Sequence, residues 1–168
     1  RRTGAQPEPQ LLLLPREQPA DAVAARRWDD AVRRAARLEH PNLAQPREIG
    51  ICEHWPYLLY DIGGAQTLAE RLRGPALAAP EAAMLCMQAL RGLAFAHDGG
   101  VAHGDLQPFM LLRAEHLPLR IIGLELGAHR SEVRGAVHTS IDALQLAALR
   151  EAAPRDALSV GLMLHWML

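Results

Sequence analysis

The chain has 168 residues, of which 49% are hydrophobic, and its formal net charge is −1. This length and apolar content predict one domain with a buried core and exclude a disordered chain. The near-neutral charge, without a polybasic cluster, argues against nucleic acid or an anionic membrane surface as the main partner. No apolar run approaches the roughly 20 residues that a membrane-spanning helix needs.

Three residue types limit the chemistry further. The 18 basic residues counted as Lys or Arg are all arginine, so no mechanism can use a lysine of this chain. Cys52 and Cys86 lack metal-binding or redox spacing, which predicts small buried hydrophobes in a reducing compartment. The eight histidines contain no pair at helical ligand spacing, so we expect no zinc site. The chain has no signal peptide, which predicts a cytoplasmic protein, and it opens on Arg1, which indicates a piece of a longer one.

The first half of the chain alternates strand and helix patterns. After an irregular lead-in, a short apolar run closed by Pro15 predicts a buried strand. Apolar residues at helical spacing then predict an amphipathic helix that ends before Pro41. Two strand-like stretches flank a turn and predict a hairpin. The predicted bounds are Leu11–Leu14 for the strand, Asp21–Leu38 for the helix, and Arg47–Cys52 and Tyr57–Ile62 for the hairpin.

The second half is mainly helical in pattern. Gly63-Gly64 breaks the chain, and Thr67–Leu72 predicts a short helix. A helix opening at Pro80 and stopping at Gly99 carries a dense apolar stripe typical of a core helix, which is formed by Met84, Leu85, Met87, Leu90, Leu93 and Ala94. The apolar segment Ala157–Leu168 predicts another core helix, and Trp28 and Trp166 are predicted core residues.

An acid-bearing loop follows the long helix and reads His103-Gly104-Asp105-Leu106-Gln107-Pro108-Phe109-Met110. In kinases a carboxylate orients the substrate hydroxyl, and an asparagine five residues later holds a metal ion, in the pattern H-R-D-x-x-x-x-N. This loop keeps the acid at Asp105 and has Met110 at the position of the asparagine. The alternative is that Asp105 is only a turn or cap residue.

Four further strings occur in a fixed order around this loop. They are Leu38-Glu39-His40-Pro41-Asn42-Leu43, Tyr57-Leu58-Leu59-Tyr60-Asp61, Thr67-Leu68-Ala69-Glu70-Arg71-Leu72 and Arg155-Asp156-Ala157-Leu158-Ser159-Val160-Gly161. Together with the loop they resemble the bacterial serine/threonine protein kinase family. The resemblance implies an α+β, partial protein-kinase-like fold. A strand and helix remnant of the N-lobe would span residues 1–62, and a truncated, mainly helical C-lobe would span 63–168 and end in its central helix.

The resemblance also implies roles for single residues. Asp105 corresponds to the catalytic base, while His103 and Asp156 are structural, and Asp156 should accept hydrogen bonds from the backbone of the 102–107 loop. Tyr60, Asp61 and Gly63 form the hinge side of a nucleotide slot whose floor is Leu112. The metal-binding D-F-G corresponds either to Gly123-Leu124-Glu125 or to Glu125-Leu126-Gly127. We favour the second, which makes Glu125 the candidate metal ligand, and the alternative is a solvated charge at a strand end.

Several charged groups of an active kinase are replaced in this sequence. The strand that should carry a lysine has only leucines, Ala31 stands where the helix glutamate should be, with Asp30 next to it, and Gly104 replaces an arginine. Because one lost transition-state contact costs about 2 to 4 kcal/mol, losing several predicts a background rate. ATP with Mg²⁺, the cofactors that the resemblance implies, should bind weakly or not at all.

Three interpretations remain open at this point. The favoured one is an inactive pseudokinase that regulates or scaffolds bacterial signalling through a protein partner or neighbouring domains of the parent chain. The second is an active serine/threonine kinase, or a small-molecule phosphotransferase of the kind that carries H-G-D, with Asp105 as the base for transfer of the ATP γ-phosphate. The third is a relic that only spaces its neighbours.

Overall fold

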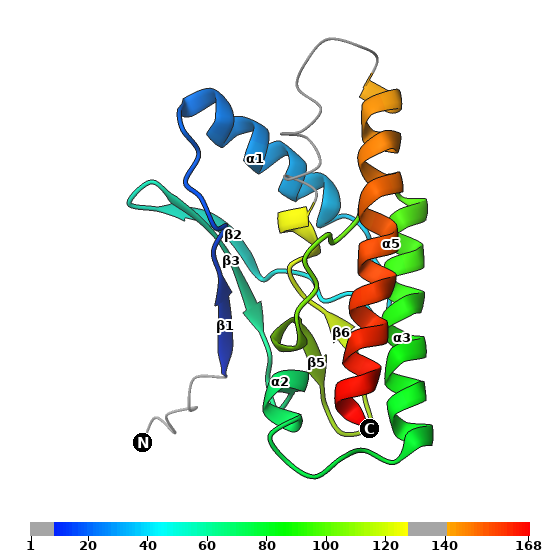
Figure 1. The fold of residues 1–168 in the computed structure, drawn as a ribbon. Helices are drawn as coiled ribbons and strands as arrows, with labels where there is room; N and C mark the ends of the chain where they lie inside the picture. Colours follow the sequence, from blue (N-terminus) through cyan, green and yellow to red (C-terminus); the bar gives the residue numbers. More distant parts are fainter. Residues whose placement is uncertain (1–8, 128–140) are drawn as a thin grey trace, which may run out of the picture.

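The computed structural model describes residues 9–127 and 141–168, with the backbone alone for 141–148. A three-stranded sheet and the helix beside it form one side of the molecule. Two long helices form the other side, and a smaller sheet lies between (Figure 1). The predicted α+β class and order of elements are confirmed. Within the described ranges, no helix is both long and apolar enough to cross a bilayer.

The first sheet has the order β1-β3-β2 and is antiparallel throughout. Its strands are β1 (Gln10–Leu13), β2 (Glu48–Cys52) and β3 (Trp55–Asp61), so the predicted strand and hairpin are both present. The prediction of a fully buried first strand was wrong, because Leu13 is buried while Leu12 and Leu14 are 54% and 50% exposed. Strand β1 lies at the edge of the sheet, where alternate side chains point to opposite faces and only one face is covered. Cys52 is also exposed, contrary to prediction, since it ends β2 at the hairpin.

Helix α1 (Ala22–Ala35) is amphipathic, as predicted. Asp21 caps its first turn by accepting a hydrogen bond of 2.7 Å from the amide of Ala24. The buried face consists of Trp28, Ala31, Val32 and Ala35, so Trp28 is a core residue as expected. The helix ends three residues before Leu38, the predicted last residue, because the chain turns there toward Pro41.

The segment after α1 joins the first half of the chain to the second. The amide of Ile121 donates to the carbonyl of Asn42 at 2.9 Å, and the amide of Ala44 donates to the carbonyl of Ile121 at 2.8 Å. The side-chain amide of Asn42, which is buried, donates to the carbonyl of Leu119 at 2.8 Å. Asn42 therefore fixes this segment by both backbone and side-chain hydrogen bonds.

The second sheet is short and has the order β4-β5-β6. Its strands are β4 (Gln66–Thr67), β5 (Leu111–Arg113) and β6 (Arg120–Ile121). Helix α2 (Leu68–Arg71) follows β4 where a short helix was predicted, and Thr67 and Glu70 form a reciprocal capping box at its start. A single 3-10 turn, η1 (Pro108–Met110), leads from the Asp105 loop into β5.

The two long helices are α3 (Ala79–Asp98) and α5 (Ile141–Met167), which pack side by side (Figure 1). Both were predicted as core helices, but only one face of each is buried among the described side chains. The residues of the predicted stripes that are exposed include Met84, Met87, Leu90, Leu158, Leu162 and Trp166. The buried face of α3 consists largely of small side chains between Leu85 and Leu93, and it includes Cys86, which is buried as predicted.

Candidate functional site

Asp156 anchors the backbone of the acid-bearing loop. Its side chain is completely buried on α5, and its two oxygens accept hydrogen bonds from the amides of His103 at 2.9 Å and Gly104 at 2.6 Å. A ring nitrogen of His97 lies 2.8 Å from the same carboxylate. The predicted hydrogen bonds to the loop are therefore present, and the buried carboxylate is matched by three polar neighbours.

His103 and Gly104 shape the start of the loop. His103 is fully buried, and its Nε2 lies 3.1 Å from the carbonyl oxygen of Ile122, just after β6. Gly104 has a φ of +71°, in the left-handed region that favours glycine. This turn directs the following residue, Asp105, away from the core toward the open side of the loop.

Asp105 is partly accessible, with 21% of its side chain exposed. Its carboxylate accepts hydrogen bonds from the guanidinium of Arg16 at 2.6 Å and from the side-chain amide of Gln107 at 3.1 Å. Arg16 follows β1, so this contact runs from the first sheet to the loop. Sequence reasoning missed Arg16, because an exposed arginine 89 residues away carries no local signal of its partner.

Two apolar side chains, Met110 and Leu13, lie close to Gly123 beside this loop. Met110, which stands where a kinase has asparagine, is buried at 7% exposure. Gly123 has a φ of +83°, and a Cβ there would lie 3.1 Å from a methyl of Leu13, 3.5 Å from Nε2 of His103 and 3.8 Å from the methyl of Met110. The strand that should carry a lysine thus places Leu13 directly over Gly123. Ala31, at the position of the helix glutamate, is also buried, and Asp30 beside it is exposed.

Glu125 and Tyr60 form a buried polar pair between the first sheet and the segment after β6. They are 2% and 1% exposed, and the Tyr60 hydroxyl donates to Glu125 at 2.5 Å. The same hydroxyl accepts from the amide of Gly123 at 3.0 Å. Burial raises the pKa of Glu125 to about 7, against the lowering effect of the hydrogen bond from Tyr60. The pKa of Tyr60 is raised well above its usual value, mainly by burial and to a smaller extent by the charge of Glu125 and its hydrogen bond.

This environment corrects one interpretation of Glu125 and leaves the other as a prediction. A solvated strand-end charge is wrong, because the side chain is buried. Its role as a metal ligand stays a prediction, and so does the choice between the two registers around Gly123 and Glu125. Among residues whose side chains are described, no group of three or more His, Cys, Asp or Glu is arranged to hold a metal ion.

The predicted hinge residues lie at the end of β3 and in the turn that leads from β3 to β4. Strand β3 ends at Asp61, whose carboxylate accepts hydrogen bonds from Gln10 at 2.9 Å and Arg47 at 3.0 Å, and these two contacts lower its pKa. Gly63, with a φ of +53°, has open space at its Cβ position. Leu112 on β5 is buried in the same core cluster as Tyr60. The structure therefore brings Tyr60 and Leu112 into one core, while Asp61 lies on the surface; nucleotide contacts remain a prediction.

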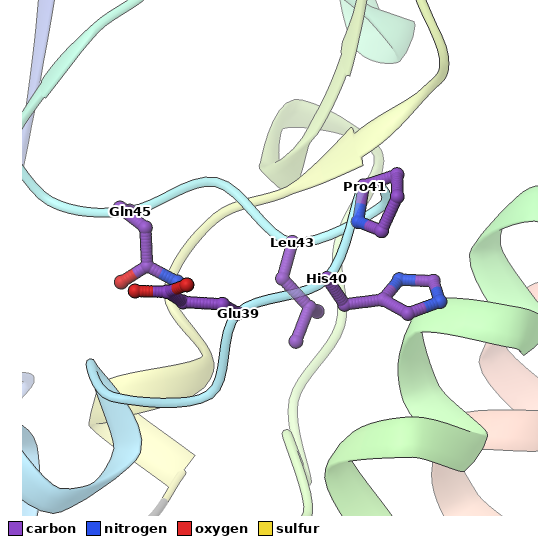
Figure 2. A pocket seen from close by; sticks show the side chains of 5 residues that line it. All are labelled: Glu39, His40, Pro41, Leu43 and Gln45. Carbon is purple, nitrogen blue, oxygen red and sulfur yellow. The ribbon is translucent and has the colours of Figure 1, made fainter.

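A separate open pocket of about 340 Å³ lies on the segment after α1 (Figure 2). Figure 2 shows Glu39 beside Gln45, whereas His40 points to the opposite side, toward helix α3. The His40 ring stacks on Phe95 with centroids 5.0 Å apart, and Gln45 donates to the carbonyl of Leu38 at 2.8 Å. These polar groups support the fold of the segment, and no sequence pattern predicted the pocket.

Comparisons with known proteins agree with this geometry. No family model matches the chain. The chain is 32% identical over 127 residues to mitogen-activated protein kinase mpkC of Aspergillus oryzae, covering 71% of this chain and 35% of that protein. It is 31% identical over 116 residues to cyclin-dependent kinase F-1 of Oryza sativa subsp. japonica, covering 62% of this chain and 23% of that protein. The chain thus spans about a quarter to a third of these curated relatives.

Solved structures show the same fold. The kinase domain of PknI from Mycobacterium tuberculosis matches with a TM-score of 0.56 and 20% identity, over 70% of this chain and 49% of that one. A double mutant of that domain matches with a TM-score of 0.58 and 15% identity, over 98% of this chain and 88% of that one. The chain therefore has a protein-kinase-like fold, and the residues described above form a protein-kinase-like domain.

Proposed function

We propose that this protein-kinase-like domain is a pseudokinase, a catalytically inactive regulatory or scaffolding module of bacterial signalling. The observation that carries the proposal is the contact of Leu13 and Met110 with the position of Gly123. Phosphoryl transfer needs cationic groups and metal ligands around the phosphates. Gly123 is surrounded by methyls of Leu13 and Met110, by the buried His103 ring, and by the Tyr60 hydroxyl, which is itself bonded to Glu125. None of these neighbours is an arginine or a lysine, and the one carboxyl among them is already paired with Tyr60, so these residues do not fit a triphosphate with its metal ion.

The remaining parts of the proposal follow from the same assignment. The domain would comprise an N-lobe remnant over residues 1–62 and a partial C-lobe over 63–168, and it would act in the cytoplasm by binding a protein partner or neighbouring domains of its parent chain. The similarity to a mycobacterial kinase domain supports bacterial signalling. The kinases named among the relatives support a serine/threonine kinase ancestry.

An active phosphotransferase is the second candidate, and one observation favours it. Asp105 is partly exposed on a loop whose backbone is firmly held by Asp156, which is the placement a catalytic base needs. The ion pair with Arg16 would then be an obstacle that a substrate has to displace.

Incubation with labelled ATP and Mg²⁺ or Mn²⁺ distinguishes the two candidates. We expect no transfer to a protein substrate or to the domain itself. The variant Arg16→Ala tests whether the domain is inactive only because Arg16 covers Asp105. We expect this variant to be inactive as well, because the phosphate-binding charges are still missing. Turnover by either protein that disappears on adding Asp105→Ala would show that the domain is an enzyme.

Nucleotide binding is tested separately by thermal shift with adenosine, ADP and ATP, each with and without Mg²⁺. We expect little or no stabilisation, and any effect should come from the base, since the buried Tyr60 would fill part of the proposed slot. Mg²⁺ should add nothing. A large stabilisation by MgATP alone, lost in Glu125→Ala, would establish a metal and phosphate site and contradict the proposal.

A further inference from the structure

Strand β3 carries two tyrosines, and each donates a hydrogen bond to a glutamate. Tyr57 is bonded to Glu48 on the neighbouring strand β2, within the same sheet, and this pair is exposed. Tyr60 is bonded to Glu125, 65 residues later in the chain, and this pair is buried. The two pairs share their chemistry and their strand, but only the second links the first sheet to the C-terminal half of the molecule.

The hydroxyl of Tyr60 is fully used in this link. It donates to Glu125 and accepts from the amide of Gly123, so one oxygen binds the segment after β6 at two points. Leu13 on β1 adds an apolar contact over Gly123. Two strands of the first sheet therefore hold the same short segment.

We propose that Tyr60, Glu125 and Gly123 form a latch, which closes the first sheet on the segment after β6 without any ligand. Breaking the link would remove the acceptor of the Gly123 amide and the hydrogen bond from Tyr60 to the Glu125 carboxyl, and that cost opposes opening. A ligand or partner that needs the sheet to move away must first break these bonds. The latch itself needs only the residues of this chain. The further idea, that a protein partner meets the domain in this closed form, rests on the proposed function.

The latch is tested on the full chain, without nucleotide or partner, by two measurements on Tyr60→Phe. The first is hydrogen exchange of the Gly123 amide. The second is the distance between two spin labels. One label is on Cys52, which is exposed on the hairpin, and the other is on α3 in the variant Arg91→Cys, at an exposed position. Cys86 is buried and should not react. We expect exchange to accelerate about tenfold or more and the distance distribution to broaden.

Tyr57→Phe is the matched control, since it removes the same hydroxyl from the same strand at the exposed pair. It should leave the exchange of Gly123 and the label distances as in the wild type. An unchanged distribution and unchanged exchange in Tyr60→Phe would overturn the latch.

A double variant protects the test against a failure to fold. Tyr60→Phe with Glu125→Met removes both polar side chains, so no carboxyl remains buried without a partner. The amide of Gly123 still loses its acceptor, and we expect the same faster exchange and broader distances. Closed, wild-type distances in a folded double variant would contradict the latch. Because no measurement involves ATP, catalytic activity in the assay above would overturn the proposed function and leave this result intact.

Discussion

The acid-bearing loop is held by hydrogen bonds on one side and borders apolar side chains on the other. On one side, the fully buried carboxylate of Asp156 accepts hydrogen bonds from two loop amides and lies beside a ring nitrogen of the partly exposed His97. On the other side, methyls of Leu13 and Met110 lie next to Gly123, 3.1 and 3.8 Å from where a Cβ would stand. The side at Asp156 needs only donors at the right distance from one acid. The side at Gly123 would need several charged groups at once for phosphoryl transfer, and the proposed function holds that they are replaced there.

The largest expected change in the free energy of unfolding comes from removing the carboxylate of Asp156. Asp156→Ala leaves the buried amide of His103 and the partly buried amide of Gly104 without an acceptor. A buried amide without an acceptor costs about 1 to 3 kcal/mol, so the free energy of unfolding should fall by about 3 kcal/mol. Denaturant unfolding measures this change. Asp98→Ala, at the exposed end of α3, is the control and should stay within about 0.5 kcal/mol of the wild type. A loss below about 1 kcal/mol in Asp156→Ala would mean that this carboxylate does not support the loop.

The Glu125 carboxyl gives the next largest effect, through pH. Its pKa rises from 4.5 to about 7 on folding, so the folded protein binds more protons than the unfolded chain between these values. The free energy of unfolding should therefore fall as the pH rises through this window, by on the order of 3 kcal/mol in all. Below pH 4.5 the contribution is fully present, and above about 7 it is lost.

Matched variants isolate this carboxyl from the others. Glu125→Gln should remove the dependence between pH 4.5 and 7, whereas Glu48→Gln, at the exposed tyrosine pair, should keep it. Asp61 and Glu70 have lowered pKa values, so their stabilising contributions disappear at more acidic pH and do not mimic the effect. Identical pH profiles for the wild type and Glu125→Gln would show that burial does not hold the proton on Glu125.

Local patterns were enough to predict the elements, and the contact of Asp156 with the loop came from the resemblance to kinases. Helix α1, the hairpin and α3 follow from periodicity and from breaks at Pro and Gly, which act over a few residues. The resemblance to kinases named the loop as the partner of Asp156, and the physical argument added only that a buried carboxylate must find donors. The apolar stripes said less about burial, since periodicity cannot show what covers a face, and Met84 and Trp166 are exposed.

The side of the loop at Gly123 was not predictable in the same way. Tyr60 and Glu125 are 65 residues apart, and nothing in their neighbouring residues indicates that they meet. The two possible registers around Gly123 also left the position of Glu125 open. The one usable signal was an acid surrounded by Ile, Leu and Gly, a composition that favours burial over the solvated alternative.

The smallest expected effect is on the exposed side of the loop, at the pair of Arg16 and Asp105. The arginine side chain is 78% exposed, so water and salt screen the attraction, and holding a long side chain in place costs entropy. Arg16→Ala should therefore change the free energy of unfolding by less than about 1 kcal/mol, and the difference should vanish at about 1 M salt.

Arg33→Ala, which breaks an exposed pair with Asp29 within α1, provides the scale for such a contact. If Arg16→Ala costs no more than this control, Asp105 is held by its loop and not by its ion pair. A loss of more than about 2 kcal/mol, insensitive to salt, would mean that the exposed side is anchored as firmly as the side at Asp156. Asp105 and Asp156 would then both stabilise the fold, because a rigid, paired Asp105 would hold the loop in the same way as the carboxylate of Asp156. The two sides would differ only in the groups that make the contacts.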